Sequence, residues 1–483
     1  MARRVLILSA SVGSGHISAA AAIEQALRTY PDMQVENRDA LKLTSRIYQV
    51  TASDAYFALV KENPWLVGWW YDQNDEPFRN EVGALKLWNM LNAQPLADFI
   101  LDYRPDITIC THFLPAGMVA QLLSEGEIAT RLAIVTTDFD FQGMWLSRVF
   151  HRYFVAIEET KVHLAALGVD PERVTVSGIP VNRLFGEPVD RPAVLQHFGL
   201  RDELPVIMVS AGALGGGPAQ QIVAQLLQLR TPAQVVVVCG RNQTLRQEVT
   251  KQVSGQAERF RVIGFTNEMP DLLRVATLFI GKPGGLTAAE CLAAGLPMVV
   301  IEPIPGQEER NTDHLLENGA AIRCRSLNTL AYKVDRILSE PGRLDGLRAG
   351  TRRLGRPDAA AVVADTLLND SSEPQSFSSN ELKQIIAAAR NNEVEIPEPP
   401  ARRPEVALYH DDTGRYVGVI TPDDLQFLID QLEEEDDDDE TYYVDPSTLD
   451  FLAERGARPT LLDVLWHAVA DRSGTEIRYV RSA

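Results

Sequence analysis

The stretch GKPGGLTAAECLAAGLP, residues 281–297, decides the fold class of the chain. It follows the apolar run ATLFI at residues 276–280, which is typical of a buried strand, and it continues into an Ala- and Leu-rich segment that favours helix. Between the two, Pro-Gly-Gly marks a sharp turn. A strand that turns directly into a helix is the repeating unit of a parallel α/β protein.

Similar units extend in both directions from this stretch. Short β-rich runs alternate with amphipathic segments in two series, which are RVLILSA, MQVENRD, DITICTH, RLAIVTTD and YFVAIEE, then PVIMVSAG, AQVVVVCG, RFRVIGF, ATLFIG and PMVVIEP. This alternation predicts two doubly wound α/β halves. We expect the first half to span residues 1–183 and the second 184–370, with a hinge between Pro180 and Pro192.

The composition is that of a globular protein, with 45% apolar and 23% charged residues in a chain of 483. The chain contains no uninterrupted apolar run of about 18 residues, the length that a membrane-spanning helix needs. Its four cysteines lie far apart without a Cys-x-x-Cys pair, which argues against a zinc site or a disulfide framework. We therefore expect a soluble or peripheral protein in a reducing cytoplasm.

The net charge of −20 comes mostly from the C-terminal part, because residues 371–483 hold 25 acidic and 10 basic side chains. No part of the chain carries the broad positive field that nucleic-acid binding requires. Residues 371–404 are rich in Ser, Asn, Glu and Pro, so we expect a flexible linker there. Residues 405–483 begin with the hairpin pattern VALYH-DDTG-RYVGVI and are expected to form a small acidic α+β module, with a solvated acidic loop at 433–440.

The first glycine-rich turn, ASVGSGH at residues 10–16, lies between the first predicted strand and the first predicted helix. Its glycines let a ligand approach the N–H groups of a helix N-terminus. A dinucleotide fingerprint is incomplete, since Ser18 stands at its third glycine, although Asp39 ends a plausible second strand. The helix dipole disfavours a charged imidazole, so His16 is either a neutral proton acceptor or a simple hydrogen-bond partner in the turn.

Two further turns lie in the second series. Residues 210–217, SAGALGGG, form either a diphosphate cradle or a flexible loop. Thr287 and Glu290 fit a capping box that satisfies the N–H groups of its own helix, or they contact a ligand. The next strand ends in Pro-Gly-Gln-Glu at residues 305–308, where an amide and a carboxylate can bind sugar hydroxyls.

Three motifs, SVGSGH, KPGGLTAAE and PIPGQEERN, resemble those of the diacylglycerol glycosyltransferases, which include processive diacylglycerol glucosyltransferases and monogalactosyldiacylglycerol synthases. The resemblance covers about residues 3–368. It implies the GT-B fold, in which two Rossmann-like halves face each other across a cleft. It also implies inverting transfer of glucose or galactose from a UDP-sugar to the sn-3 hydroxyl of diacylglycerol, without a metal or another cofactor.

The resemblance implies roles for particular residues. His16 and Asp138 are the leading candidates for activating the lipid hydroxyl. The second half would hold the donor, with uracil near Phe265 and the ribose at Glu290; the full donor set is Gly212, Ala213, Gly215, Gly216, Arg241, Phe265, Thr266, Gly284, Gly285, Leu286, Thr287, Glu290, Gly306, Gln307 and Glu308. The acceptor set is Gly13, Ser14, Gly15, His112, Trp65, Trp69 and Trp70.

The chain departs from the family at Leu214 and Gln142, which replace common histidines, so the donor sugar is left open. Asp138-Phe139-Asp140 spells an Asp-x-Asp metal–nucleotide motif, but the nucleotide signals lie in the other half and no metal is expected. A diacylglycerol acceptor requires contact with a bilayer. The PWLVGWWY stretch, residues 64–71, holds three of the six tryptophans and either meets lipid headgroups or packs as core.

We expect a peripheral protein at the anionic inner face of the cell membrane. Arg148 and Arg152 either meet anionic headgroups there or are ordinary surface residues. The acidic C-terminal module would be repelled from that surface and would face the cytosol, available to a protein partner. The alternatives are transfer to another lipid, such as a peptidoglycan precursor or a carotenoid, a non-catalytic UDP-sugar sensor, and an NAD-linked oxidoreductase, which Ser18 disfavours.

Overall fold

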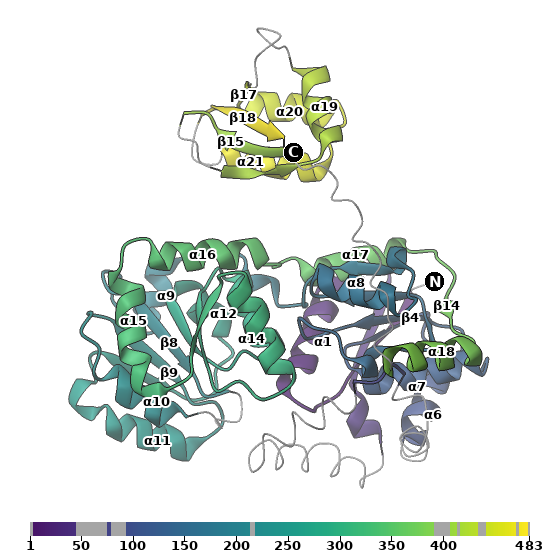
Figure 1. Cartoon of the computed structure of the whole chain (residues 1–483), viewed down its shortest axis with the longest axis horizontal. Helices are drawn as coiled ribbons and strands as arrows, with labels where there is room; N and C mark the ends of the chain where they lie inside the picture. Colours follow the sequence, from purple (N-terminus) through teal and green to yellow (C-terminus); the bar gives the residue numbers. More distant parts are fainter. Residues whose placement is uncertain are drawn as a thin grey trace. The chain divides into compact units, whose positions relative to one another are not determined.

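The computed structural model describes residues 3–44, 75–78, 93–212, 218–390, 406–412, 416–432, 441–469 and 473–481. The chain forms two compact units, Met1–Ile396 and Pro397–Ala483 (Figure 1). Within the described residues, no helix combines the length and the apolar character that crossing a bilayer requires.

The first half of the larger unit is a six-stranded parallel sheet in the order β2-β1-β3-β4-β6-β7. Its strands are β1 Arg3–Ser9, β2 Met33–Asp39, β3 Ile107–Cys110, β4 Arg131–Val135, β6 Arg152–Val155 and β7 Val174–Val176. Its helices are α1 Ser14–Leu27, α6 Gln94–Tyr103, α7 Phe113–Ser124 and α8 Glu158–Ala166, with short 3-10 turns at η1 Ala40–Leu43, η4 Gly143–Trp145, η5 Pro171–Arg173 and η6 Arg183–Phe185.

The apolar runs of this sheet are continuous because helices cover both of its faces. Along β1, Val5 and Ile7 pack with α1 on one face, whereas Leu6 and Leu8 pack with α6 and α7 on the other. Successive side chains of a strand point to opposite faces, so a strand covered on both sides needs an apolar residue at every position.

The second half repeats this plan in the order β10-β9-β8-β11-β12-β13, again with parallel strands. Its strands are β8 Val206–Ser210, β9 Gln234–Val238, β10 Phe260–Ile263, β11 Leu278–Gly281, β12 Met298–Ile301 and β13 Ala321–Cys324. Its helices are α9 Arg191–His197, α10 Ala219–Leu226, α11 Gln243–Gln252, α12 Met269–Val275, α13 Gly285–Ala293, α14 Gln307–Glu317, α15 Leu330–Ser339 and α16 Arg343–Leu354, with 3-10 turns η7 Ser254–Gln256 and η8 Leu327–Thr329.

The strand orders place a topological switch point in each sheet, between β1 and β3 in the first and between β8 and β11 in the second. In doubly wound sheets, ligands bind beyond the carboxyl ends of the strands at such points. The SVGSGH motif follows β1 and the KPGG motif follows β11, so both motifs lie at switch points. The predicted doubly wound α/β architecture is confirmed.

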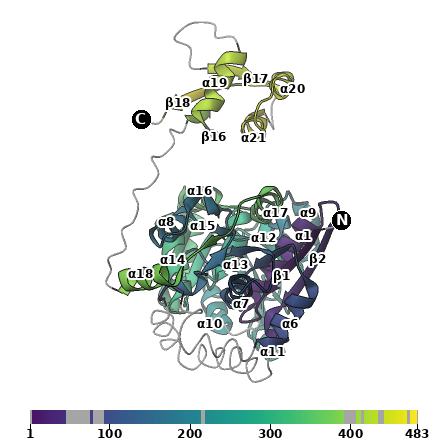
Figure 2. The ribbon, with the colours of Figure 1, turned by 90° about the vertical axis from the view of Figure 1, so that its right-hand side faces the viewer.

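The chain returns to the first half after the second sheet is complete. Helix α17 (Ala359–Asn369) packs against α1 (Figure 2). Strand β14 (Gln375–Ser376) pairs with β5 (Val149–Phe150). Helix α18 (Ser379–Arg390) follows, and Leu382 joins the core of the first half together with Phe377. Arg152 of the first half binds this return segment, residues 359–390. Its Nε donates a hydrogen bond of 2.8 Å to the carboxylate of Asp370.

The linker prediction for residues 371–404 is wrong for its first part, since β14 and α18 pack into the first half. This segment is polar in overall composition, but four of its apolar residues pack against the core of the first half. They are Phe377, Leu382, Ile385 and Ile386. Arg152 is not a headgroup-facing surface residue either, because its side chain is only 15% exposed. The boundary between the halves at residues 183 and 184 stays a prediction.

The smaller unit is a four-stranded antiparallel sheet in the order β16-β15-β18-β17. Its elements are β15 Val406–His410, β16 Tyr416–Ile420, α19 Pro422–Gln431, β17 Thr441–Val444, α20 Pro446–Glu454, α21 Pro459–Val469 and β18 Thr475–Arg481. The predicted hairpin is confirmed as β15 and β16. The acidic run at residues 433–440 lies outside the described residues.

Candidate active site

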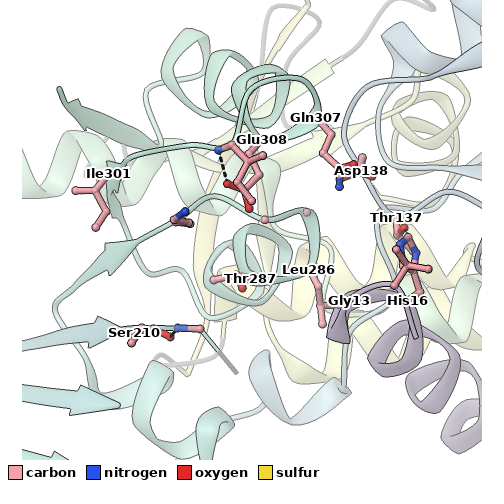
Figure 3. A pocket seen from close by; sticks show the side chains of 18 of the residues that line it. Gly13, His16, Thr137, Asp138, Ser210, Leu286, Thr287, Ile301, Gln307 and Glu308 are labelled. Atoms are coloured by element: carbon pink, nitrogen blue, oxygen red, sulfur yellow. Dashed lines mark hydrogen bonds between the residues drawn. The ribbon is translucent and has the colours of Figure 1, made fainter. Parts of the chain in front are cut away.

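A cavity of about 290 Å³ lies between the carboxyl ends of the two sheets (Figure 3). The first half contributes Val12, Gly13, Gly15, His16, Thr137 and Asp138 to its lining. The second half contributes the turns after β8, β11 and β12, including Gly212, Lys282, Gly284, Gly285, Leu286, Thr287, Gln307 and Glu308. Figure 3 shows His16 and Thr137 on one side and Glu308 and Ser210 on the other.

Three helices begin at this cavity with a glycine N-cap that makes no side-chain capping bond. Gly13 caps α1, Gly284 caps α13 and Gly306 caps α14. The first N–H groups of a helix have no partner within the helix, and the dipole makes that end partly positive. Three such ends around one space create a binding site for an anion.

The capping-box interpretation of Thr287 and Glu290 is wrong, because α13 begins at Gly285 and makes no side-chain cap bond. Thr287 lies inside the first turn of the helix and lines the cavity. Pro283, Gly284 and Gly285 let the helix start three residues earlier than the Thr-x-x-Glu spacing predicts. Both polar side chains are therefore left for other contacts.

The imidazole of His16 is held in one tautomer. Its Nδ1 lies 2.9 Å from the carbonyl oxygen of Thr111 and 2.8 Å from the hydroxyl of Thr137. A carbonyl only accepts, so Nδ1 carries the hydrogen and the lone pair is on Nε2. Burial lowers the pKa of His16 to about 4, against a smaller raising effect of the Thr111 hydrogen bond, so the ring is neutral at pH 7 and can accept a proton.

The ring of His112 packs against the ring of His16. It is 3% exposed, its ring meets that of His16 edge to face at 4.5 Å, and its Nδ1 accepts the backbone N–H of Leu114 as the N-cap of α7. Trp145 lies 6.5 Å from His16 on the same side. His112 lies outside the cavity lining, and its predicted contact with the acceptor stays a prediction.

Asp138 follows β4 and is 8% exposed. Its Oδ1 accepts a hydrogen bond of 3.2 Å from the amide of Asn311 on α14. Burial raises the pKa of Asp138 to about 6, although the Asn311 hydrogen bond opposes this rise. The carboxylate is therefore mostly ionised at pH 7, and it shares the cavity with the neutral ring of His16.

Two carboxyl groups of the second half have raised pKa values. Burial raises the pKa of Glu308 to about 7, while a backbone bond from Ile304 (2.7 Å) and the charge of Lys282 lower it. Burial raises the pKa of Glu290 to about 8. Carboxyl groups that titrate near neutral pH can either donate or accept hydrogen bonds to sugar hydroxyls.

The remaining predicted site residues divide into three groups. Those that line the cavity are Gly13, Gly15, Gly212, Gly284, Gly285, Leu286, Thr287, Gln307 and Glu308. Those that lie outside its lining are Arg241, Phe265, Thr266, Glu290 and Gly306; of these, Phe265 is 52% exposed and Arg241 stacks on its ring at 4.7 Å. The side chain of Ser14 is not among those described. Ala213, Gly215, Gly216, Trp65, Trp69 and Trp70 fall outside the described residues, as does Leu214. The individual roles stay predictions.

Several residues of the site were assigned no role in the sequence analysis. Lys282 and Thr137 line the cavity, and Asn311 holds Asp138. Lys282 and Asn311 stand within the quoted motifs KPGG and PGQEERN, which was the available signal, whereas Thr137 could be found only from its contact with His16. In the part of the chain that is described, no group of three or more His, Cys, Asp or Glu side chains is placed to hold a metal ion.

Two parts of the chain match known protein families. Residues 16–181 match the model of monogalactosyldiacylglycerol synthase, and residues 207–350 match the glycosyltransferase family 28 C-terminal domain. The first half of the chain is therefore similar to monogalactosyldiacylglycerol synthases, and the second half is similar to family 28 glycosyltransferases. The two matches fall on the two halves that enclose the cavity.

Individual relatives agree with the family match. A processive diacylglycerol β-glucosyltransferase of Bacillus cytotoxicus is 28% identical over 377 residues, which are 76% of this chain and 94% of the relative. The enzyme of that name from Bacillus mycoides is 27% identical over 374 residues, 76% of this chain and 93% of its own. MurG from Acinetobacter baumannii shares the fold, with a TM-score of 0.51 and 20% identity over 76% of this chain and all of MurG.

Proposed function

We propose that this chain is an inverting glycosyltransferase that moves a hexose from a UDP-sugar to the sn-3 hydroxyl of diacylglycerol. The observation that carries the proposal is the cavity itself. A neutral imidazole with a free Nε2 and an ionised Asp138 lie on one side, and two uncapped helix N-termini for a diphosphate lie on the other. The names of the relatives supply the acceptor and the hexose.

The chemistry uses both sides of the cavity. The acceptor oxygen attacks the anomeric carbon from the face opposite UDP, while His16 Nε2 or Asp138 removes its proton. The bond from the anomeric carbon to the β-phosphate oxygen breaks, and that oxygen takes the electron pair. The N-termini of α13 and α14 stabilise the charge that develops on UDP, because their dipoles are already oriented before the reaction.

On the donor side, we assign the hexose to Gln307 and Glu308, whose side chains reach the cavity. The ribose is assigned to Glu290 and the uracil to the turn at Phe265, which lies outside the cavity lining. The acceptor enters past Gly13 and Gly15. We further propose that the chain acts as a peripheral protein at the inner face of the membrane, and that no metal takes part.

Transfer to a panel of lipid acceptors tests the proposal. The purified chain is offered diacylglycerol, a peptidoglycan lipid precursor and a carotenoid, each with radiolabelled UDP-glucose or UDP-galactose. We expect label in a diacylglycerol product. Label only in another lipid would move the acceptor to a different class, and tight binding of UDP-sugar without turnover on any lipid would identify a sensor.

The C-terminal unit is proposed to bind a protein partner. A deletion that tests this must begin at residue 397, because a deletion from residue 371 would remove β14 and α18 from the catalytic unit.

Lys282→Met should weaken UDP binding about tenfold, the effect of losing one contact to a charged group. Lys282 lines the cavity at the start of the turn to α13, and its charge lowers the pKa of the Glu308 carboxyl group. Isothermal titration with UDP measures the change, with Lys282→Arg retaining most of the affinity. The matched control is Lys333→Met, since Lys333 binds the carbonyl of Arg323 outside the cavity. Unchanged UDP affinity in Lys282→Met would remove this lysine from the donor site.

A further inference from the structure

Helix α14 of the second half carries two side chains that reach the loop after β4 in the first half. Arg310 and Asn311 stand side by side on this helix, one turn beyond its start. Their partners in the first half are residues 138–141, the loop that contains Asp138, and Asp75, which Arg310 also binds. The same helix begins with Gln307 and Glu308, which line the cavity.

Asn311 makes two hydrogen bonds across this boundary and one within its own half. It is fully buried, its Oδ1 accepts the backbone N–H of Phe139 at 3.0 Å, and its Nδ2 donates to Asp138 Oδ1 and to the Pro283 carbonyl, both at 3.2 Å. One amide thus joins the loop of Asp138 to the Pro-Gly-Gly turn ahead of α13. Removing it would leave buried polar groups unpaired, which is costly in a closed interface.

Arg310 forms an ion triad beside this amide. Its Nη1 lies 2.8 Å from Asp140 Oδ2, and its Nη2 lies 2.9 Å from Asp75 Oδ2. Asp75 in turn accepts the backbone N–H of Gly143 at 2.7 Å through its other oxygen. The three side chains are between 25% and 42% exposed, so the triad is only partly screened by solvent.

We propose that Arg310 and Asn311 are positioning residues that hold the Asp138 loop against the donor half when the cleft is closed. Gln307 and Glu308, which line the donor side, and Asn311, which binds Asp138, all belong to the start of α14, so one rigid helix connects the donor site to Asp138. The two halves also approach closely at Gly285 of α13, because a Cβ at this position would stand 2.1 Å from the carbonyl oxygen of Thr137. The proposal depends on the proposed function only for the catalytic consequence, since the contact itself can be measured without turnover.

Hydrogen–deuterium exchange tests the contact directly. The amide of Phe139 is protected by Asn311, and the amide of Gly143 by the aspartate that Arg310 binds. In Asn311→Ala and in Arg310→Gln, exchange in the segment 138–143 should rise about tenfold, the effect of losing one or two hydrogen bonds. Peptides from β8 and β9 should exchange as before, which shows that the halves remain folded.

The matched control is Arg323→Gln. Arg323 pairs with Glu309 of the same helix turn at 2.6 Å and is similarly buried, but both partners lie in the donor half. Exchange at 138–143 should not change in this variant. If Arg323→Gln raised the exchange as much as Arg310→Gln, or if neither Arg310→Gln nor a folded Asn311→Ala raised it, the cross-cleft role would be overturned.

Kinetics then separate positioning from donor binding. For both variants we expect kcat to fall about tenfold or more while the KM for the UDP-sugar changes less than threefold, because the loop held by α14 carries Asp138 and not the donor. A rise in KM with unchanged kcat would overturn the positioning role. If the wild-type chain transfers no hexose, the proposed function fails, and the exchange experiment still decides whether α14 holds the loop.

Discussion

His16→Ala lowers kcat by about 100-fold or more and leaves the affinity for UDP unchanged, a loss within the range for removing a general base. The ring is fixed by Thr111 and Thr137 so that Nε2 is the only nitrogen with a free lone pair. Its low pKa of about 4 keeps it unprotonated at every pH from about 5 upwards. Among the described residues, no other imidazole lines the cavity.

Steady-state turnover and isothermal titration with UDP give the two numbers for this variant. Asp138→Asn should lose a comparable amount of turnover, since the charge that shares the cavity with His16 is removed. The control is His197→Ala, because His197 is 60% exposed and pairs with Glu268 on the surface of the donor half. If His16→Ala retained more than a tenth of the wild-type kcat, the assignment of His16 would be wrong.

Gly285→Ala should reduce turnover about 100-fold without unfolding the protein, because a misplacement of about 1 Å at a reacting centre can cost that much. The added methyl would stand 2.1 Å from the backbone oxygen of Thr137 and 2.9 Å from Asp138 Oδ1. Backbone cannot rotate away as a long side chain can, so α13 and the Asp138 loop must separate. Alanine itself suits the first turn of a helix, so the melting temperature should change little.

Turnover and thermal unfolding, measured on the same preparation, separate these two effects. Gly346→Ala is the matched control, since this exposed glycine of α16 has nothing within 4 Å of the added methyl. Alanine in place of a helical glycine should stabilise the chain by about 0.5–1 kcal/mol and leave turnover unchanged. Full activity in Gly285→Ala would show that the halves need not approach as closely as they do here.

The predictable part of the fold rests on local pattern. The β-rich runs from RVLILSA to PMVVIEP all form strands. The central ones are continuously apolar, because a parallel strand covered on both faces needs an apolar residue at every position. The glycine-rich turns lie at the switch points because they directly follow β1, β8 and β11, the strands at those points. His16 and Asp138 were assigned together from the family resemblance, and both follow strands of one sheet.

The unpredicted part rests on contacts between distant segments. Residues 375–390 look like a linker by composition, yet Phe377 and Leu382 bury in a core that lies far back in the sequence. Arg310 and Asn311 read as ordinary polar residues of a helix, and only the tertiary structure brings Asp75, Asp138 and Asp140 to them. The helix start at Gly285 likewise depends on close packing against Thr137, which a capping pattern cannot reveal.

The anomeric configuration of the product tests the central claim most directly. The purified chain is incubated with diacylglycerol and an equal mixture of UDP-glucose and UDP-galactose, and the glycolipid is analysed by mass spectrometry and by proton NMR of the anomeric signal. One base on the acceptor side and a diphosphate site on the opposite side predict a hexosyl-diacylglycerol with the β-linkage, formed from the α-linked donor by a single displacement. An α-linked product, or no glycolipid at all, would contradict the account.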